Sequence, residues 1–315
     1  MGGPLLANFS VGLALPRGLE DAQMWLWPGF PGSDDQLARA GWAVLHFEAR
    51  GAASAGRGTG EPSLDLPNAR IVLAACAAPR GFATTEPAEA CARGEVGLRA
   101  SGQDLTLALG TGAGPLILSD SAWRGVATRL GVAPEAGTAG LLYTPFTRAG
   151  IPALFVDLPR LALFQGTSGQ DWLGACAELA RARRIEWALA RAEDGACFQP
   201  CDASGSRAVT TRPYLELGGS LRVAVVSQSS EIIRSLNVDA PPNPQVDGVV
   251  GAGTLAGTRL HLDYLATPSG RVLAACEVGS SRDVCWAAPS CPGFPQGSAH
   301  TCFGQARSAW PAVCP

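Results

Sequence analysis

Short apolar runs, separated by turns that contain glycine or proline, constrain the fold of this chain more than any other feature. Its 315 residues include 39 glycines and 24 prolines, and these residues repeatedly interrupt the apolar runs. Short runs rich in valine, isoleucine and leucine are typical of β-strands, whereas an amphipathic helix needs a longer stretch with a helical period. The sequence therefore predicts a mostly β fold with a few helices.

The expected strands alternate in polarity or are apolar throughout. They are 9–15, 22–26, 42–47, 69–76, 105–109, 139–144, 153–164, 184–190, 214–217, 221–226, 246–251, 258–264 and 271–276. Tight turns predict hairpins at 9–27, at 95–109 and at 214–226, the last one around Gly218-Gly219. Helices are expected at 34–41, at 170–183 and up to Leu130, the last one started by Ser119 or Asp120.

Composition excludes several classes of protein. Hydrophobic residues make up 47% and charged residues 16% of the chain, which is typical of a globular protein. No apolar stretch reaches the ~18 residues of a transmembrane helix, so we expect no membrane span. The net charge is −3 and the chain has no basic run, so we expect no nucleic-acid partner. All 24 basic residues are arginine, which suggests a GC-rich bacterial genome.

Ten cysteines, an even number, favour disulfides and therefore an exported protein. They are Cys76, Cys91, Cys176, Cys197, Cys201, Cys276, Cys285, Cys291, Cys302 and Cys314. Their spacing does not fit a zinc site, and the three histidines are scattered, so we expect no metal and no cofactor. We expect a secreted, periplasmic or cell-surface location, with the signal peptide absent from this sequence.

A glycine-rich turn follows one of the clearest strands. Leu105–Leu109 leads into Gly110, Thr111 and Gly112, and the apolar run 115–118 leaves the turn before the expected helix.

A second glycine-bearing segment lies further along the chain. Asp247 and Gly248 precede two valines and Gly251. The segment is expected to form a short apolar strand, and its glycines allow another backbone to approach closely.

The order of these segments resembles one lobe of the pepsin and retropepsin superfamily of aspartic peptidases. In that family a hairpin feeds Asp-Thr/Ser-Gly, a strand and a short helix follow, and a later Asp-Gly-apolar-apolar-Gly segment crosses behind the active loop. The resemblance covers about residues 95–276. It implies a closed β barrel with a ψ-loop crossing, in which Gly110, Thr111 and Gly112 form the active loop, and Asp247, Gly248 and Gly251 belong to the crossing strand.

The resemblance also implies a lost activity. Aspartic peptidases need two facing carboxylates that share one proton, and Gly110 stands where one of these acids belongs. We therefore expect an exported, non-catalytic binding or structural module that holds a peptide or protein in a cleft. The sequence does not indicate its oligomeric state.

Two alternatives remain open, and both are enzymes. One is an active aspartic endopeptidase that uses acids outside the Gly110 motif. The other is a divergent α/β-hydrolase, suggested by the glycine-rich loop 28–33 and the strand 42–47, although no nucleophile elbow is found.

Three regions are expected along the chain. Residues 1–94 form a β-rich region that is a possible degenerate first lobe, and 95–276 form the aspartic-peptidase-like lobe with an insertion near 165–207. Residues 277–315, rich in cysteine and proline, form an extension held by disulfides.

Overall fold

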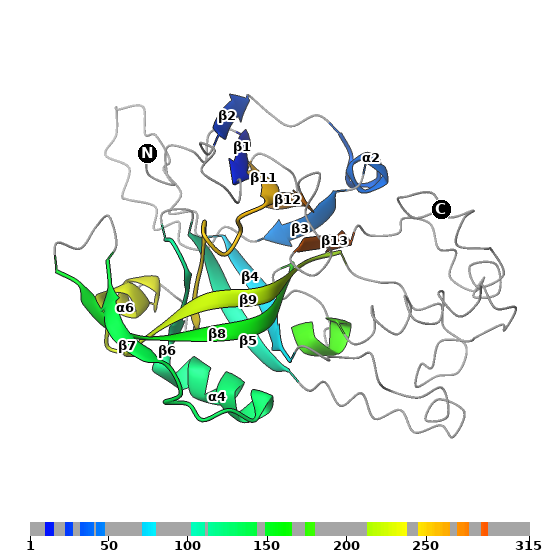
Figure 1. The fold of residues 1–315 in the computed structure, drawn as a ribbon. Coiled ribbons are helices and arrows are strands. Elements are labelled where there is room, and N and C mark those ends of the chain that lie inside the picture. The colour runs from blue at the N-terminus through cyan, green and yellow to red at the C-terminus, as the bar shows by residue number, and fades with distance from the viewer. Residues whose placement is uncertain are drawn as a thin grey trace, which may run out of the picture.

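The computed structural model of the chain is dominated by β-strands, which form two sheets (Figure 1). The described residues are 10–15, 23–27, 32–40, 42–47, 71–79, 102–110, 113–143, 149–165, 174–179, 213–237, 245–264, 270–276 and 285–288. The expected mostly β fold with a closed barrel and a few helices is confirmed.

The larger sheet closes into a barrel of six strands. In order around the barrel they are β9 (Tyr214–Val226), β6 (Leu116–Ser119), β10 (Gly248–Gly251), β5 (Gln103–Gly110), β4 (Val72–Ala78) and β8 (Ile151–Phe164). Pairing of β8 with β9 closes the ring. Two further strands extend this sheet at its ends, β7 (Thr138–Leu142) beside β8 and β13 (Cys285–Ala288) beside β9.

The smaller sheet joins strands from the two ends of the described chain. Its order is β2 (Gln23–Trp27), β1 (Ser10–Leu15), β11 (Thr258–Asp263), β12 (Gly270–Cys276) and β3 (Ala43–Phe47), with all neighbours antiparallel. One face contributes Val11, Phe47 and Leu260 to the same hydrophobic core as the barrel. The two sheets therefore share one core. The short helix α2 (Asp34–Arg39) packs against β3.

The helix α4 (Asp120–Leu130) follows β6 directly, as the sequence predicts. Ser119 is its N-cap and accepts a hydrogen bond from the Ala122 N–H. Gly131 ends the helix in the left-handed conformation, with φ of 69°, which glycine adopts without steric cost. A second helix, α6 (Glu231–Asn237), covers the outer face of the barrel, where Ile233 packs with Ile117 and Val249.

The strand β10 lies between two strands that follow one another along the chain. It runs parallel to β5, with Gly251 opposite Gly110, and antiparallel to β6, with Gly248 opposite Leu118. The segment expected to be buried beside Gly110 therefore occupies that position. A strand placed in this way is found in several barrel folds, so the topology alone does not assign the family.

Three glycines make this crossing possible, because each meets backbone where a side chain would begin. A Cβ atom on Gly248 would lie 2.0 Å from the carbonyl oxygen of Ile117. A Cβ on Gly251 would lie 2.5 Å from the oxygens of Ala113 and Pro115, and one on Gly253 would lie 2.4 Å from that of Gly114. The glycine pattern in this part of the sequence thus follows from close backbone approach.

The hairpin expected around Gly218-Gly219 is wrong, because β9 runs without interruption from Tyr214 to Val226. Its partner β8 is equally long, and the two pair along most of their lengths. The register shifts between Leu158 and Arg160, opposite the glycines, and Gly219 has φ of 92°. The glycine pair therefore accommodates a β-bulge, which bends the strand.

The hairpin expected at 95–109 stays a prediction, because residues 95–101 lie outside the described residues. Within the described part, β5 pairs with β4 and, at residues 107–110, with β10. The α/β-hydrolase alternative is wrong because that fold needs a mainly parallel sheet between layers of helices, whereas the described strands form a barrel and an antiparallel sheet.

The strand pairings also cross the expected boundaries at residues 94 and 276. From the first region β4 joins the barrel, and from the last region β13 extends the same sheet beside β9. The strands β11 and β12 of the middle region complete the sheet that contains β1, β2 and β3. The expected strand 184–190 and most of the helix 170–183 lie outside the described residues, as does most of the insertion near 165–207.

Replacing Gly251 by alanine tests the crossing. We expect Gly251→Ala to lower the free energy of unfolding by at least about 2 kcal/mol, because the new methyl group meets two backbone carbonyls that cannot rotate away. The control is Gly114→Ala, where a Cβ meets nothing within 4 Å and stability should stay within about 0.5 kcal/mol. Urea unfolding measures both, and equal stability of the two variants would contradict the crossing geometry.

Candidate functional site

Gly110 ends β5 at the point where the crossing strand passes. It lies opposite Gly251, and its carbonyl accepts a hydrogen bond of 3.0 Å from the Ala113 N–H. Thr111 and Gly112, the other two residues of the expected active loop, lie outside the described residues. Gly110, the position where the family resemblance implies an acid, thus lies on the barrel, and the structure assigns no role to it.

The space beside Gly110 is filled by a neighbouring side chain. A Cβ atom on Gly110 would lie 2.5 Å from Cγ1 of Val249. Val249 is buried and packs with Ile117 and Ile233 on the outer face of the barrel. An aspartate at position 110 would therefore require Val249 to move, and its carboxylate would begin beside an apolar cluster.

Asp247 links the crossing strand by hydrogen bonds to both of its neighbours, β5 and β6. Its carboxylate accepts the Thr106 N–H at 2.8 Å, and its own N–H donates to the Thr106 carbonyl at 2.7 Å. Its carbonyl accepts the Ser119 N–H at 2.9 Å. Burial raises the pKa of the Asp247 carboxyl, and the hydrogen bond from Thr106 opposes this shift. The side chain thus accepts a hydrogen bond from the backbone of β5.

Other carboxylates of the barrel sheet and α4 also have nitrogen donors as partners. Asp104 accepts the Cys176 N–H at 2.7 Å, and Asp120 accepts the Gln228 N–H at 3.0 Å. Asp157 lies 3.8 Å from Arg222, and the buried Glu216 accepts a hydrogen bond of 2.7 Å from Arg160. These carboxylates therefore have structural roles, as acceptors for backbone N–H groups and as members of ion pairs.

A second polar cluster lies on the smaller sheet, and sequence reasoning missed it. The buried Asp263 accepts hydrogen bonds from Ser10 (2.8 Å) and from Nε of Arg271 (3.0 Å). Arg271 continues to Asp34 at 2.7 Å, and Nε2 of His46 lies 2.7 Å from the other oxygen of Asp34. This chain of contacts links the first residue of α2 to four strands, β1, β3, β11 and β12.

This cluster has the character of a structural network. Burial opposes ionisation of Asp34, but hydrogen bonds from Arg271 and His46, together with their charges, outweigh it and hold the pKa of Asp34 below its usual value. The sequence predicted a helix that starts at residue 34 but no partner for Asp34. Asp34 and Arg271 are 237 positions apart, so only the pairing of β3, β11 and β12 reveals that they meet.

Two disulfides join distant parts of the described chain. Cys76 of β4 bonds to Cys176 across 100 residues, and Cys276 of β12 bonds to Cys285 of β13. The expectation of disulfides is thereby confirmed for four cysteines, and it is compatible with an extracellular location. The other six, Cys91, Cys197, Cys201, Cys291, Cys302 and Cys314, lie outside the described residues.

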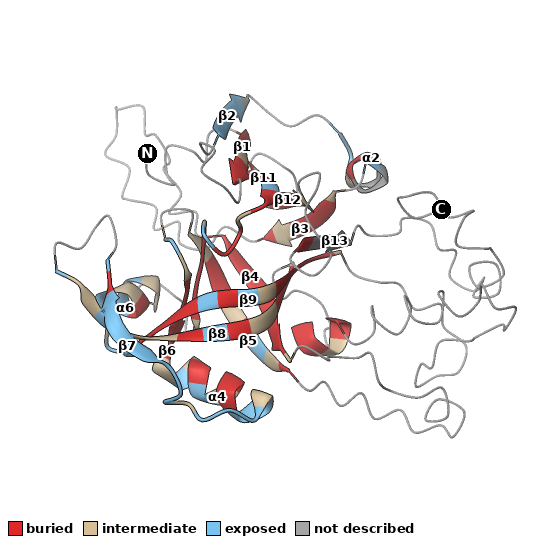
Figure 2. Cartoon of the chain, viewed as in Figure 1, coloured by how far each residue is buried: buried red, intermediate tan, exposed pale blue. Residues whose placement is uncertain are grey.

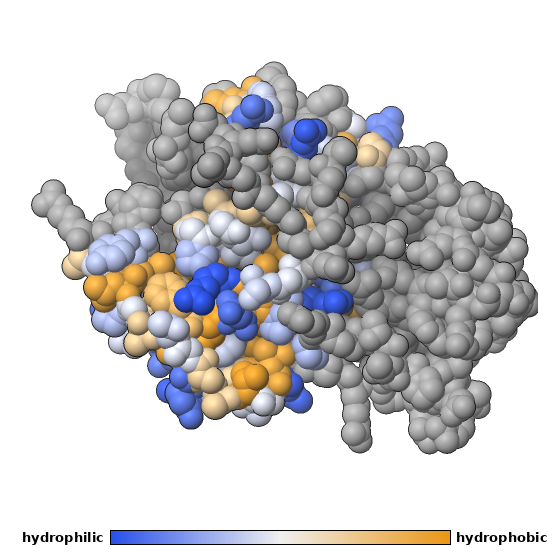
Figure 3. All heavy atoms as spheres, viewed as in Figure 1, coloured by the Kyte–Doolittle hydropathy of each residue, from blue (hydrophilic) through white to orange (hydrophobic). Residues whose placement is uncertain are grey.

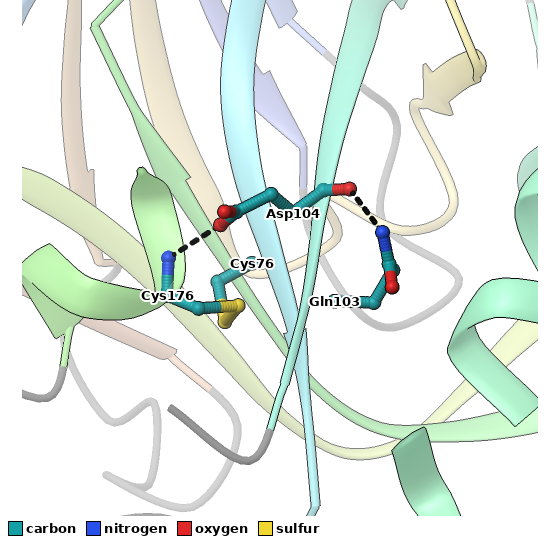
Figure 4. Close-up of a disulfide and its surroundings, with 4 residues drawn as sticks. All are labelled: Cys76, Gln103, Asp104 and Cys176. Carbon is teal, nitrogen blue, oxygen red and sulfur yellow. Dashed lines mark hydrogen bonds between the residues drawn. A yellow bond between two sulfur atoms is a disulfide. The ribbon is translucent and has the colours of Figure 1, made fainter. Parts of the chain in front are cut away.

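The surroundings of the first disulfide explain its position (Figure 4). The Asp104 carboxylate on β5 accepts the Cys176 N–H at the start of a helical turn, and the Gln103 side chain donates to the Asp104 carbonyl. A Cβ on Gly102 would lie 2.7 Å from both sulfurs, so glycine leaves the space that the disulfide fills. This arrangement anchors the segment 174–179 to the barrel.

Two searches of the described residues bear on ligands and membranes. They contain no group of three or more histidine, cysteine, aspartate or glutamate side chains that could hold a metal ion. None of the helices within them is both long and apolar enough to cross a bilayer.

Two substitutions of Asp247 distinguish the contribution of its hydrogen bond to stability from the contribution of its charge. We expect Asp247→Ala to lower the free energy of unfolding by about 1–3 kcal/mol, because the buried Thr106 N–H loses its acceptor. Asp247→Asn keeps an acceptor oxygen and should stay within about 1 kcal/mol of the wild type at neutral pH.

The raised pKa of the Asp247 carboxyl predicts how the stability of the wild type, relative to Asp247→Asn, depends on pH. A carboxyl with a raised folded pKa contributes stability that is complete below its unfolded pKa of 3.8 and is lost as pH rises through the folded pKa. The stability of the wild type relative to Asp247→Asn should therefore fall as pH rises from acid toward neutral, measured by thermal unfolding. A wild-type advantage that grows with pH would show instead that the charge itself stabilises the fold.

Comparison of the chain with protein-family models and with curated proteins found no match.

Proposed function

We propose that this chain is a non-catalytic binding module with an aspartic-peptidase-like barrel. The observation that carries the proposal is the position of Gly110, which ends β5 beside the crossing strand and has a Val249 methyl group where a catalytic side chain would begin. The order of the motif, with a strand, a glycine turn, a second strand, a capped helix and a later crossing strand, supports the family relationship.

The chemistry of the family explains why such a barrel is inactive. An ionised carboxylate must activate water while its protonated mate polarises the scissile carbonyl, and the two must lie within about 3 Å to share a proton. Position 110 offers no carboxyl group, and the Asp247 carboxylate lies beside Thr106 rather than Gly110 and accepts a hydrogen bond there from the backbone of β5. Loss of one general acid–base group costs ~10²–10⁴-fold in rate.

The hairpin of β7 and β8 supplies a surface for binding. Thr138, Ala139, Gly140 and Leu141 are all exposed, so this part of β7 shows both faces to solvent (Figure 2). Within the described sheet β7 pairs only with β8. The small side chains at its start leave its backbone open to an extended protein segment, which can add to a sheet edge as a further strand.

The position of Pro152 on β8 indicates which backbone N–H groups of β7 are available to a bound segment. Leu141 lies opposite Pro152, and proline has no N–H to donate. Because hydrogen-bonded and non-hydrogen-bonded pairs alternate in an antiparallel ladder, the N–H groups of Leu141 and Ala139 point to the free edge. These two residues are the expected donors to a bound segment.

The disulfides agree with export, so we propose a secreted or cell-surface setting in a bacterium.

Unfolded casein serves as both substrate and ligand in the test. We expect the pure protein to bind reduced casein without cleaving it between pH 3 and pH 7, with or without pepstatin. Ala139→Pro removes an outward N–H and should weaken binding about tenfold, since one hydrogen bond and the local strand geometry are lost.

The control for this experiment lies on β2, the strand at one end of the smaller sheet in the described part of the chain. Met24→Lys on β2 should leave casein binding unchanged. Pepstatin-sensitive cleavage by the wild type would contradict the proposal and favour a peptidase that uses acids outside the Gly110 motif. Absence of casein binding would remove the role assigned to β7.

A further inference from the structure

The two disulfides among the described residues differ in their exposure to solvent. Cys76 is fully buried and Cys176 is 2% exposed, and both pack in one hydrophobic cluster. Cys285 is 3% exposed, but its partner Cys276 is only partly buried. Reduction of a disulfide by a thiol requires that the attacking thiolate reaches one of the two sulfurs. A reductant in solution therefore has better access to the second disulfide, at its Cys276 end.

This second disulfide connects the two sheets. Cys276 is the last residue of β12, in the smaller sheet, and Cys285 is the first residue of β13, which extends the barrel sheet. In the described part of the chain, β13 pairs with β9 over residues 214–217. The pairing of β8 with β9 closes the barrel without β13. Departure of β13 from β9 would therefore leave the ring of six strands intact.

The short length of β13 makes its attachment dependent on the disulfide. The strand has four residues, and pairing of so few residues has to offset the conformational entropy that they lose. The disulfide joins positions nine apart and holds the first residue of β13 directly against the end of β12. Breaking this bond increases the conformational freedom of β13 and so favours its departure from β9.

We propose that Cys276–Cys285 is a redox-sensitive bond that controls the attachment of β13 to the barrel sheet, and that its reductant is a dithiol. One thiolate of the dithiol attacks Sγ of Cys276 and forms a mixed disulfide, while Cys285 leaves as a thiolate and takes a proton from water. The second thiolate of the reductant then displaces Cys276, which leaves and is protonated in turn. Two electrons and two protons thus pass from the dithiol, which becomes a disulfide, to the two cysteines.

The burial of Cys285 couples the breaking of this bond to the movement of β13. Its side chain packs in the core that the two sheets share, and a thiolate is costly in apolar surroundings. Movement of Cys285 toward solvent lowers this cost and gives the sulfur access to a proton. Cleavage of the bond and departure of the start of β13 therefore favour one another.

The redox-sensitive bond lies away from the surface proposed to bind casein. β13 pairs with the part of β9 that lies opposite residues 161–164 of β8, whereas β7 pairs with residues 151–155. Figure 3 shows apolar residues gathered at the left of the view, where Figure 1 places β7 and α6. The redox proposal does not rest on the proposed function, and failure of either leaves the other standing.

Timed alkylation tests the order of reduction. The native protein is treated with dithiothreitol, alkylated with iodoacetamide at successive times and mapped by mass spectrometry. We expect Cys276 and Cys285 to be alkylated at least about tenfold faster than Cys76 and Cys176, since access limits the exchange. Alkylation of Cys285 also reports the movement of β13, because this side chain is only 3% exposed in the oxidised protein.

Hydrogen exchange tests the release of the strand. In an antiparallel ladder alternate N–H groups face opposite neighbours, so part of the amides in 214–217 face β13. These amides and those of 285–288 that face β9 should exchange at least about tenfold faster after reduction. The amides of 223–226, a part of β9 that pairs with β6 and β8, should not change.

The control variant C276A/C285A separates this bond from the other cysteines. Without any reductant it should show the same fast exchange at 214–217, and dithiothreitol should not increase that exchange further. Circular dichroism shows whether the variant keeps the fold, and if it does not, the reduced wild type decides. Reduction of Cys76–Cys176 first, or unchanged exchange at 214–217 in the reduced wild type, would overturn the proposal. An equal gain at 223–226 would overturn it too, because the barrel itself would then open.

Discussion

The contact between β10 and the strands on either side of it determines the rest of this structure. At Gly248 and Gly251 the backbone of β10 comes closer to its neighbours than a side chain would allow. Asp247 holds the start of the strand by hydrogen bonds with Thr106 of β5 and Ser119 of β6. The barrel closes around this strand. The same crossing brings Val249 against Gly110, so a Val249 methyl group fills the space where a side chain at position 110 would begin.

Much of the fold could be predicted because the strands are short, apolar and separated by turns. The helix after β6 could be predicted to within one residue at its start, since Ser119 and Asp120 are both strong N-cap residues. A failure came where tertiary pairing overrode a local signal. Gly218-Gly219 is a typical hairpin turn, yet β8 is long enough to hold β9 straight through it as a bulge.

The candidate site was predictable in part. The proximity of Gly110 to the crossing segment followed from the family resemblance, but the obstruction by Val249 did not, because it depends on which face of β10 a side chain occupies. The Asp34–Arg271–Asp263 network left no motif, since its members come from different strands and a helix.

Amide hydrogen exchange on the crossing strand tests this account most directly. With β5 on one side and β6 on the other, the N–H groups of Val249 and Val250 should exchange only by global unfolding, and so be among the slowest in the protein. The Ala139 N–H, on the free edge of β7, should exchange rapidly under the same conditions. If the amides of Val249 and Val250 exchange as fast as that of Ala139, β10 is not held between β5 and β6. The barrel described here would then be incorrect.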